Sequence, residues 1–234
     1  MEEDYASAVR GWTGGAQMRA RIQWATPDID QQILYIARVS NPKDQASGKT
    51  GLLRYLMEHG HVSPFEMANV CMQIDTTRDI GRQILRHRSF SFQEFSQRYA
   101  SVHYLQSGSV TREARLQDVK NRQNSLPTAD QDLERWWSAV QAGIARQCDQ
   151  AYSEALSRGI AKEQARAILP EGLTTSRLYM NGTMRSWIHY LQQRLDPTTQ
   201  KEHRELAGEV LAQLRTVAPI TMDAFFPDNS LSCA

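Results

Sequence analysis

The stretch from residue 67 to residue 88 changes its hydrophobic period without a break, and this change constrains the fold more than any other feature of the chain. Apolar and polar residues alternate through MANVCMQID (67–75), which is the period of a strand with one buried face. TTRDIGRQILRHR (76–88) then places apolar residues at helical spacing behind a threonine cap, so we expect a helix that ends around Arg88. A strand that runs directly into a helix predicts a fold that mixes the two.

Helices dominate the rest of the chain. We expect helices over 50–60, 133–158, 162–169, 185–195 and 202–217, a second strand over 173–182, and an irregular polar segment over 100–130. The fold class is therefore α+β, a helix-rich single domain with a small mixed or antiparallel sheet. We place this domain at 21–220, after a loosely ordered extension (1–20) and before a tail (221–234).

Composition narrows the classes of protein that the chain can belong to. A net charge of +1 over 234 residues argues against a protein whose main task is to coat nucleic acid, because such domains carry a large basic excess. No run approaches the ~20 apolar residues of a membrane span, and the acidic N-terminus has no apolar leader. Cys71, Cys148 and Cys233 form no CxxC pair, so neither a disulfide framework nor a zinc cage is expected, and we expect a cytoplasmic protein.

The segment RHRSFSFQEFSQR (86–98) holds the densest set of chemically useful side chains. Arginines, hydroxyls, aromatic rings and one carboxylate together suit phosphates, a ribose and a flat ring. Two other interpretations stay open. Arginines near a helix C-terminus can simply complement the helix dipole, and the basic cluster over 82–98 can bind single-stranded nucleic acid. A serine nucleophile is not expected, because no GxSxG frame is present.

This segment resembles the R-H-R-x-x-S-x-x-x-x-S-x-R signature of the flavin-dependent thymidylate synthases. All six fixed positions match, which are Arg86, His87, Arg88, Ser91, Ser96 and Arg98. Such a match arises by chance in roughly one window in ten million or fewer at typical residue usage. Segments similar to other parts of the family follow in the right order, which are ARVS (37–40), GHVSPFE (60–66), ARAILP (165–170) and RSWIHYLQQR (185–194). The resemblance covers about residues 33–217.

The resemblance implies the activity and the fold of that family. The implied reaction is the reductive methylation of dUMP to dTMP, with methylenetetrahydrofolate as carbon donor, reduced FAD as hydride donor and NADPH as the reductant of the flavin. It also implies a homotetramer with sites shared between subunits, without a role for nucleic acid or a membrane. Neither a metal ion nor an enzyme nucleophile is needed, and Cys71 is interpreted as a packing residue.

The resemblance also implies which residues bind. Contacts to dUMP are implied for Gln83, Ile84, Leu85, Arg86, Glu94, Phe95, Ser96, Gln97, Arg98, Arg166 and Arg194. Contacts to FAD are implied for Ser40, His61, Ser63, Glu66, Arg86, His87, Arg88, Glu94, Thr183, Arg185 and His189. Arg194 has the catalytic role, which is to stabilise negative charge on the pyrimidine.

The spacing of the last group supports a division of labour. Arg185, His189 and Gln193 repeat at i, i+4 and i+8, so they form one stripe of a helix. Arg194 lies about 100° around that helix and can face a different ligand.

The chain departs from the family pattern at three places. Thr183 stands where many members carry asparagine, PEGLTTSR (170–177) is one residue longer than usual, and Met67 replaces a common histidine. The departures affect the expected FAD contact at 181–183. A family member that binds both ligands but turns over poorly is therefore a further alternative.

The histidines have plainer interpretations too. His189 can be a histidine at the edge of the core, and His61 can be a loop histidine near a helix end. A metal site at His59 and His61 is not expected, because no third ligand stands at a sensible spacing.

Overall fold

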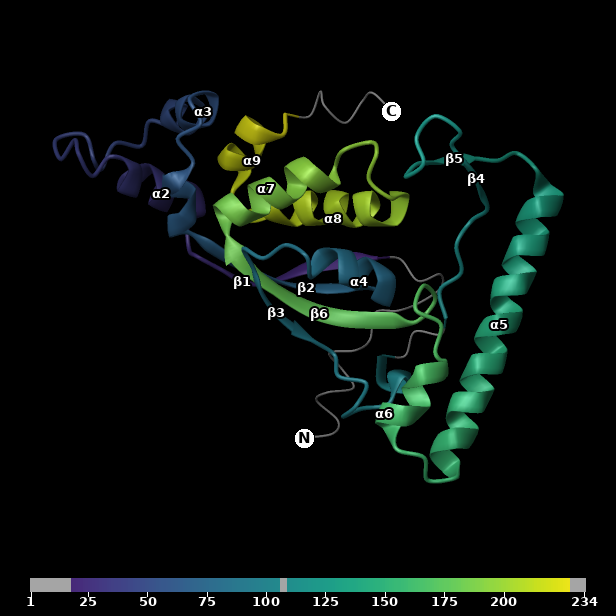
Figure 1. The fold of residues 1–234 in the computed structure, drawn as a ribbon. Helices are drawn as coiled ribbons and strands as arrows, with labels where there is room; N and C mark the ends of the chain where they lie inside the picture. The colour runs from purple at the N-terminus through teal and green to yellow at the C-terminus, as the bar shows by residue number, and fades with distance from the viewer. Residues whose placement is uncertain (1–17, 106–108, 228–234) are drawn as a thin grey trace. The chain divides into compact units, whose positions relative to one another are not determined.

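The computed structural model describes residues 18–105 and 109–227 (Figure 1). The strands are β1 (Arg19–Ala25), β2 (Asn69–Thr77), β3 (Ser91–Glu94), β4 (Arg115–Gln117), β5 (Ser125–Pro127) and β6 (Thr175–Thr183). The α-helices are α2 (Ile29–Ala37), α3 (Gly51–Glu58), α4 (Arg78–Ile84), α5 (Gln131–Ser157), α6 (Lys162–Ala165), α7 (Met184–Arg194), α8 (Lys201–Val217) and α9 (Pro219–Phe225). Short 3-10 helices are η1 (Ser63–Met67), η2 (Val102–Leu105) and η3 (Arg166–Ile168).

Four strands form one sheet in the order β1-β2-β6-β3. Arg78, directly after β2, donates its backbone N–H to the carbonyl of Thr174, directly before β6, at 3.0 Å. At the opposite ends of these strands, Met184 donates its backbone N–H to the carbonyl of Ala68 at 2.9 Å. The central strands therefore run antiparallel. The predicted α+β class, with many helices and a small antiparallel sheet, is confirmed.

The chain divides into two compact units that interleave along the sequence. In the described ranges, the α5 unit contains Met18, 75–86 and 94–178, and the α7 unit contains 19–74, 87–93 and 179–227. Strands β2, β3 and β6 contribute residues to both units. Because the units interleave, the domain boundaries expected at residues 21 and 220 stay a prediction.

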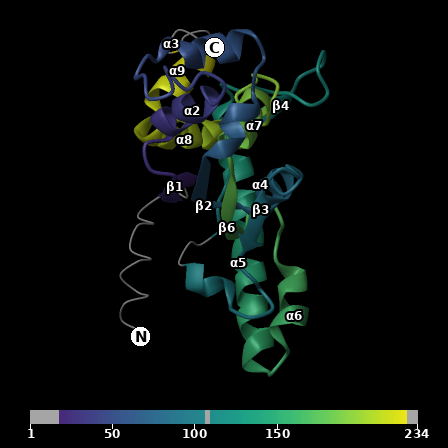
Figure 2. The same cartoon turned by 90° about the vertical axis from the view of Figure 1, so that its left-hand side faces the viewer.

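The α7 unit is built on the packing of α7 against α8, with β1 packed on α8 (Figures 1 and 2). The spacing of the apolar residues of α8 matches the helical period, and these residues point inward. The fully buried ones are Leu206, Ala207, Val210 and Leu214. This amphipathic pattern explains why the expected helix over 202–217 forms where it does.

A carboxylate on α2 determines the position of α9 in the same unit. The side chain of Asp30 accepts hydrogen bonds from the backbone N–H groups of Ile220 and Thr221 at 2.9 and 3.0 Å. A negative charge is favourable at the N-terminus of a helix, where the N–H groups have no partner within the helix. Asp30 therefore ties α9 to α2.

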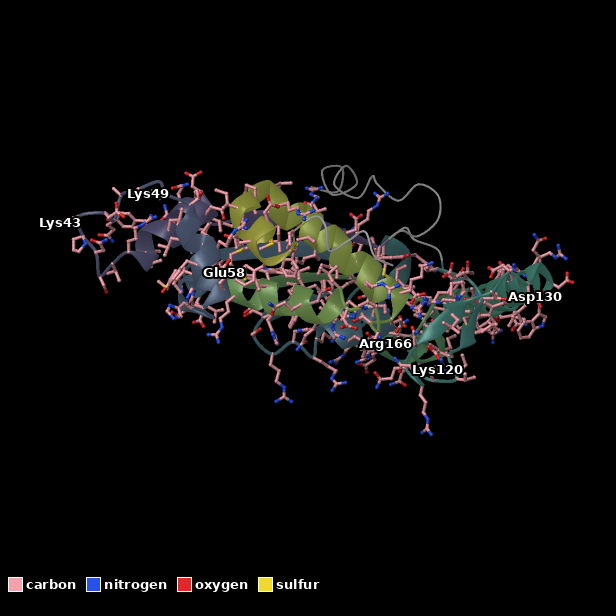
Figure 3. All side chains as sticks on the ribbon, turned by 90° about the horizontal axis from the view of Figure 1, so that it is seen from above. Lys43, Lys49, Glu58, Lys120, Asp130 and Arg166 are labelled. Carbon is pink, nitrogen blue, oxygen red and sulfur yellow. The ribbon has the colours of Figure 1, made fainter. Side chains whose placement is uncertain are left out.

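In the α5 unit, α5 begins at a well-formed cap. The Asp130 carboxylate accepts from the backbone N–H groups of Asp132 and Leu133, both at 3.0 Å, and Figure 3 labels Asp130 at this end of the helix. Further along α5, the buried Gln141 side chain binds both the N–H and the carbonyl of Arg112, at 2.9 and 2.8 Å. These two bonds fix the segment before β4 to the long helix.

Most of the expected elements are confirmed. The strand over 67–75 corresponds to β2 and the strand over 173–182 to β6. The helices correspond to α3, α5, α6 with η3, α7 and α8. The alternation holds, since Ala68, directly before β2, and Val70, Met72 and Ile74 within it are all fully buried.

The expected end of the helix at Arg88 is wrong, because α4 ends at Ile84. Arg86 follows in a turn, and His87 and Phe90 are buried in the α7 unit, where both rings pack against Tyr190. Burial of two aromatic rings outweighs the helical pattern of the sequence here. Arg86 therefore lies beyond the helix that carries Arg82.

The segment over 100–130 is more regular than expected, because it contains η2 and the antiparallel hairpin of β4 and β5. The Asp118 carboxylate closes that hairpin by accepting from the backbone N–H of Lys120 at 2.8 Å and from the side chain of Asn124 at 3.0 Å. Three-residue strands leave too few alternating positions to show in the sequence.

The structure describes part of each end of the chain. β1 begins at Arg19, inside the extension expected over 1–20, and α9 runs into the tail expected over 221–234. The rest of the expected extension (1–17) and of the tail (228–234) lies outside the described residues, as does Cys233. No helix in the described ranges is both long and apolar enough to cross a membrane.

Candidate active site

The start of the segment 94–98 is held by β6 in the α5 unit. Ser176, which is buried, donates its hydroxyl to the Glu94 carboxylate at 2.9 Å, and Phe95 donates its backbone N–H to the carbonyl of Arg177 at 2.8 Å. Arg177 in turn pairs with Asp75 of β2 at 2.5 Å, with both side chains largely buried. The position of the Glu94 carboxylate is therefore fixed by the sheet.

Gln97 has a feature that indicates a missing partner. The residue is 3% exposed, and its side-chain Nε2 is buried with no hydrogen-bond partner among the described residues. A buried amide donor without a partner costs roughly 1–3 kcal/mol. A ligand with an acceptor oxygen, such as a phosphate or a pyrimidine carbonyl, would satisfy this donor.

The two arginines expected near the phosphate differ in their partners. Arg98 pairs with Glu163 at 3.1 Å, and both side chains are well exposed. An exposed pair of this kind contributes only about 0–1 kcal/mol, so an anionic ligand can replace the carboxylate. Arg166 begins η3, one turn after Glu163, and is half-buried (Figure 3).

The predicted dUMP residues on α4 and the turn after it have mixed surroundings. Ile84 is fully buried, so only its backbone can reach a ligand, whereas Leu85 is half-buried and Arg86 is exposed. Gln83 is half-buried on the same helix. These residues remain predicted contacts.

Two arginines on α4 share one carboxylate. Arg78 and Arg82 both reach Glu171, at 3.3 and 2.6 Å. The hydrogen bond to Glu171 and its charge raise the pKa of Arg82. Glu171 lies in the stretch 170–177, which was expected to be one residue longer than the family pattern. With Arg98 also paired, carboxylates neutralise part of the basic cluster over 82–98, which weakens the nucleic-acid interpretation.

The α7 unit contains a cavity of about 630 Å³ beside the N-terminus of α7. It is lined by Val62, Glu66, Ser89, Thr183, Arg185, Ser186, Ile188, His189, Gln192 and Phe225. Four of these, Glu66, Thr183, Arg185 and His189, are among the residues predicted for FAD. A cavity of this size is typical of sites for small molecules and cofactors.

Local contacts shape the cavity wall. Arg185 forms an ion pair with Glu66 of η1, although the two are far apart in the sequence. One turn further along α7, the ring of His189 lies 3.0 Å from the side-chain amide of Gln193. The stripe expected at i, i+4 and i+8 is thus a real face of α7, and its first two members line the cavity.

The opening turn of α7 forms the floor of the cavity. Thr183 is the N-cap of α7, and its hydroxyl accepts from the backbone N–H of Ser186 at 3.2 Å. The Ser186 hydroxyl in turn donates to the carbonyl of Ser89 at 3.1 Å. A threonine at position 183 is therefore explained by its role as the N-cap of α7, independently of any contact to a ligand. Phe225 of α9 packs edge-on against Phe65 of η1, with ring centroids 5.2 Å apart, and completes one wall.

Other residues predicted for FAD lie outside the lining of this cavity. Ser40 follows α2 in an exposed turn, and Figure 3 labels Lys43 and Lys49 further along the same loop. Ser63 begins η1, and His61 is exposed with its ring edge-on to Tyr55. His87 and Arg88 directly precede Ser89, which does line the cavity. Arg86 and Glu94, predicted for both ligands, belong to the α5 unit.

Some lining residues were missed by the sequence argument. They are Val62, Ser89, Ser186, Ile188, Gln192 and Phe225. Ser89 stands at a variable position inside the signature, and Gln192 is next to Gln193, which was assigned to the stripe. Only Phe225 had no signal nearby, because α9 was not expected.

Arg194 ends α7, and a neutral histidine orients it. Its Nε–H donates to Nε2 of His87 at 2.9 Å. Burial, together with the charges of Arg194 and His189, lowers the pKa of His87 to about 4. At neutral pH His87 is therefore uncharged and can accept this hydrogen bond. His87 thus acts on Arg194, which the motif did not indicate.

Aromatic packing holds His87 in place. Its ring lies edge-on to Tyr190, with centroids 5.0 Å apart, and Phe90 fills the space beside Trp187 at 4.8 Å. Gly182 makes room for Phe90, because a Cβ there would lie 2.4 Å from the Phe90 ring. The glycine is required by close approach at this position.

Cys71, possible metal-binding groups and a second cavity give no evidence of a further reactive site among the described residues. Cys71 lies half-buried on β2, and burial raises the pKa of its thiol, which does not suit a nucleophile. Within 18–105 and 109–227, no group of three His, Cys, Asp or Glu side chains is placed to hold a metal ion. A second cavity of about 520 Å³ lies in the α5 unit beside His103 and Asp149, and no residue predicted for a ligand lines it.

Comparison with known proteins bears on this arrangement. The model of the family described as thymidylate synthase complementing protein matches residues 21–220. A flavin-dependent thymidylate synthase from Synechocystis sp. is 52% identical over 175 residues, which are 75% of this chain and 79% of that protein. A probable flavin-dependent thymidylate synthase from Paramecium bursaria Chlorella virus 1 is 49% identical over 181 residues, 76% of this chain and 82% of that protein.

Solved structures agree with the sequence comparison. A UMP/dUMP methylase, PolB from Streptomyces cacaoi, bound with 5-Br dUMP, aligns with a TM-score of 0.78 at 25% identity. The alignment covers 89% of this chain and 94% of that one. The same protein bound with 5-Br UMP aligns with a TM-score of 0.76.

Proposed function

This chain belongs to the flavin-dependent thymidylate synthase family, as its signature predicted, and we propose how its two units divide the work of that family. The protein is a methyltransferase that methylates dUMP to dTMP. The cluster in the α5 unit binds dUMP, and the α7 unit binds FAD and supplies Arg194. The observation that carries this division is that four residues predicted for FAD line one cavity of about 630 Å³.

The dUMP site is built from fixed donors around 94–98. The unpartnered amide of Gln97 and the exchangeable guanidinium of Arg98 are both suited to acceptor oxygens. Arg166 adds a second positive charge one turn from Glu163. Bonds from β6 to Glu94 and Phe95 hold this segment in place before a ligand arrives.

The flavin site combines a helix N-terminus with cationic and hydroxyl side chains. The opening N–H groups of α7, an eleven-residue helix, favour negative charge, and Arg185 and His189 line the same cavity. Ser89 and Ser186 add hydroxyl groups, and Ile188 and Phe225 add apolar surface for a flat ring. This donor set fits FAD. When bound, FAD supplies the hydride for the methylation, with NADPH as its reductant and methylenetetrahydrofolate as the carbon donor.

Arg194 has the catalytic role. A guanidinium beside the pyrimidine stabilises negative charge as it develops on the ring, and this effect is strongest where water is excluded. His87 accepts the Nε–H of Arg194, and this hydrogen bond orients the guanidinium. No side chain of the protein has to act as a nucleophile in this scheme.

The proposal also includes the assembly and the compartment. We propose a homotetramer with shared sites, which is supported by the exposed apolar side chains of Trp136 and Ile144 on α5. A dilution series in which isolated subunits keep full activity would contradict it. A cytoplasmic location stays part of the proposal.

The division is tested with flavin content and turnover in one set of variants. Purified protein should retain flavin absorbance after desalting and form dTMP from dUMP, methylenetetrahydrofolate and NADPH. Arg185→Ala should lose most of its flavin, whereas Arg98→Ala should keep the flavin and raise the KM for dUMP. Arg135→Ala, in the first turns of α5 and paired there with Asp132, is the control. Flavin retained in Arg185→Ala would contradict the assignment of the cavity.

A further inference from the structure

Behind Arg194 lies a chain of buried polar side chains that the motif does not include. His203 and Tyr190 are both fully buried, and Nε2 of His203 lies 3.2 Å from the Tyr190 hydroxyl. The Tyr190 ring contacts His87, which accepts from Arg194 at 2.9 Å. Four polar side chains thus connect the interior of α8 to the guanidinium at the end of α7.

The charge state of this chain is defined by its surroundings. The groups that face it are Arg194, His189, and the network members themselves. Burial, together with the charge of Arg194 and a smaller contribution from His87, lowers the pKa of His203 to about 3. Burial also raises the pKa of Tyr190. At neutral pH the guanidinium of Arg194 is therefore the charged group of these four, and both histidines are neutral.

Neutrality determines the tautomer of His87. Because Nε2 accepts from Arg194, the proton of the neutral imidazole must reside on Nδ1. A protonated His87 would present a second N–H and a second positive charge at 2.9 Å from Arg194. The orientation of Arg194 therefore depends on keeping this imidazole uncharged and fixed in its plane.

The geometry explains what His203 adds. Tyr190 and Arg194 stand at i and i+4 on α7, so they share one face of the helix. Arg194 is the last residue of α7, where helices commonly fray. His203 comes from α8 and holds the hydroxyl of Tyr190, which links this last turn of α7 to the neighbouring helix. The other buried residues of α8 are apolar, so a histidine here needs a specific partner to offset its burial.

We propose that His203 is a positioning residue for Arg194, acting through the Tyr190 hydroxyl and the ring of His87. The inference rests on the role of Arg194 in the proposed function. His203 touches neither ligand in this scheme. It restrains the tyrosine ring against which His87 lies, and His87 restrains the guanidinium.

The first test separates turnover from binding. His203→Leu removes the hydrogen bond at similar volume and should lower kcat about tenfold, with flavin content unchanged and a smaller change in the KM for dUMP. This pattern is expected when an interaction matters mainly in the transition state. His203→Gln, which can still bond to the Tyr190 hydroxyl, should recover most of the lost kcat. Val210→Ala, buried two turns further along α8, is the matched control for loss of packing, and its kcat should stay within twofold of wild type.

A double-mutant cycle tests the route. Tyr190→Phe removes a single oxygen atom, and it should lower kcat by a similar factor. If His203 acts through this hydroxyl, the double variant should be no worse than either single variant. Losses that multiply would overturn the route through Tyr190. Tyr190→Phe also carries the test if His203→Leu fails to fold.

A spectroscopic readout is independent of turnover. The imidazole ¹⁵N shifts of His87 should report a neutral ring with the proton on Nδ1 in the wild-type holoenzyme, and a mixture of tautomers in His203→Leu. If the wild type formed no dTMP, the proposed function would be contradicted. The NMR comparison of wild type and His203→Leu would then still test whether His203 restrains His87. An active wild type, with kcat and tautomer unchanged in His203→Leu, would overturn the inference.

Discussion

The two clusters of functional side chains are prepared in opposite ways. Around 94–98, the α5 unit presents a buried donor at Gln97, which has no partner in 18–105 and 109–227, and an exposed, weak ion pair at Arg98. In the α7 unit, Arg194 is bound by a neutral histidine that aromatic rings enclose. The first cluster leaves one buried donor without a partner among the described residues, whereas in the second cluster the donor of Arg194 is already bound. We therefore expect the first cluster to contribute mainly to the affinity for dUMP. We expect the second cluster to contribute mainly to the rate of the reaction, by holding Arg194 in a fixed orientation.

Arg194→Ala should have the largest effect, because it removes the group that is already oriented for the reaction. We expect kcat/KM to fall by about 100-fold or more, as when a preorganised charge-stabilising donor is removed. Flavin absorbance should be retained. Arg204→Ala, an arginine of the same unit that binds the carbonyl of Pro197, is the control and should stay near wild type. If Arg194→Ala kept its turnover, the second cluster would not be the one that promotes the reaction, and the proposed difference between the clusters would be wrong.

Acid should weaken the second cluster more than the first. Between pH 6.5 and about 4, the unfolded chain binds a proton at His87 that the folded protein does not, so stability falls as the pH falls through this window. The loss from His87 is on the order of 3 kcal/mol at the lower end. Thermal unfolding of wild type and His87→Gln across this range measures it. The variant should show the shallower dependence on pH, and equal slopes would contradict the prediction.

Gln97→Met should change affinity and stability in opposite directions. Removing a buried donor without a partner should raise the unfolding free energy of the ligand-free protein by up to about 1 kcal/mol. The KM for dUMP should rise about tenfold, because the donor is lost when the ligand is bound. Gln147→Met, an exposed position on α5, serves as the control for both measurements. A less stable Gln97→Met protein would mean that Gln97 is satisfied without a ligand.

Glu163→Gln should have the smallest effect. Because the pair with Arg98 is exposed, removing its carboxylate should lower the KM for dUMP by about twofold or less, with no change in flavin content. Asp149→Asn, which removes the exposed partner of His103 in the same unit, is the matched control. A large rise in KM would show that Glu163 itself contributes to the binding of dUMP.

The sequence predicted best where local spacing alone decides. The face shared by Arg185 and His189 follows from the helical period, and both residues line the cavity. The alternation through β2 predicted its buried face for the same reason. Family resemblance added Glu66, which pairs with Arg185 from a segment far away in the sequence.

The features that the sequence did not predict depend on tertiary contacts, which no local pattern of residues shows. α4 ends early because His87 and Phe90 are buried in the α7 unit, although the sequence continues a helical pattern. Phe225 lines the cavity only because α9 is held by Asp30 of α2. His203 has no motif around it, and its role emerges only from the partner that it meets on α7.

The cap on α9 has a consequence for the order in which the protein matures. Phe225 follows every other residue of the cavity wall in the chain, so it is the last of them to be synthesised. It is also held through Asp30 of α2, which is synthesised early. The cavity therefore closes only when an early and a late part of the polypeptide have met. We expect FAD, which we propose to bind in this cavity, to be loaded after translation, and proteolytic loss of α9 should yield a colourless protein.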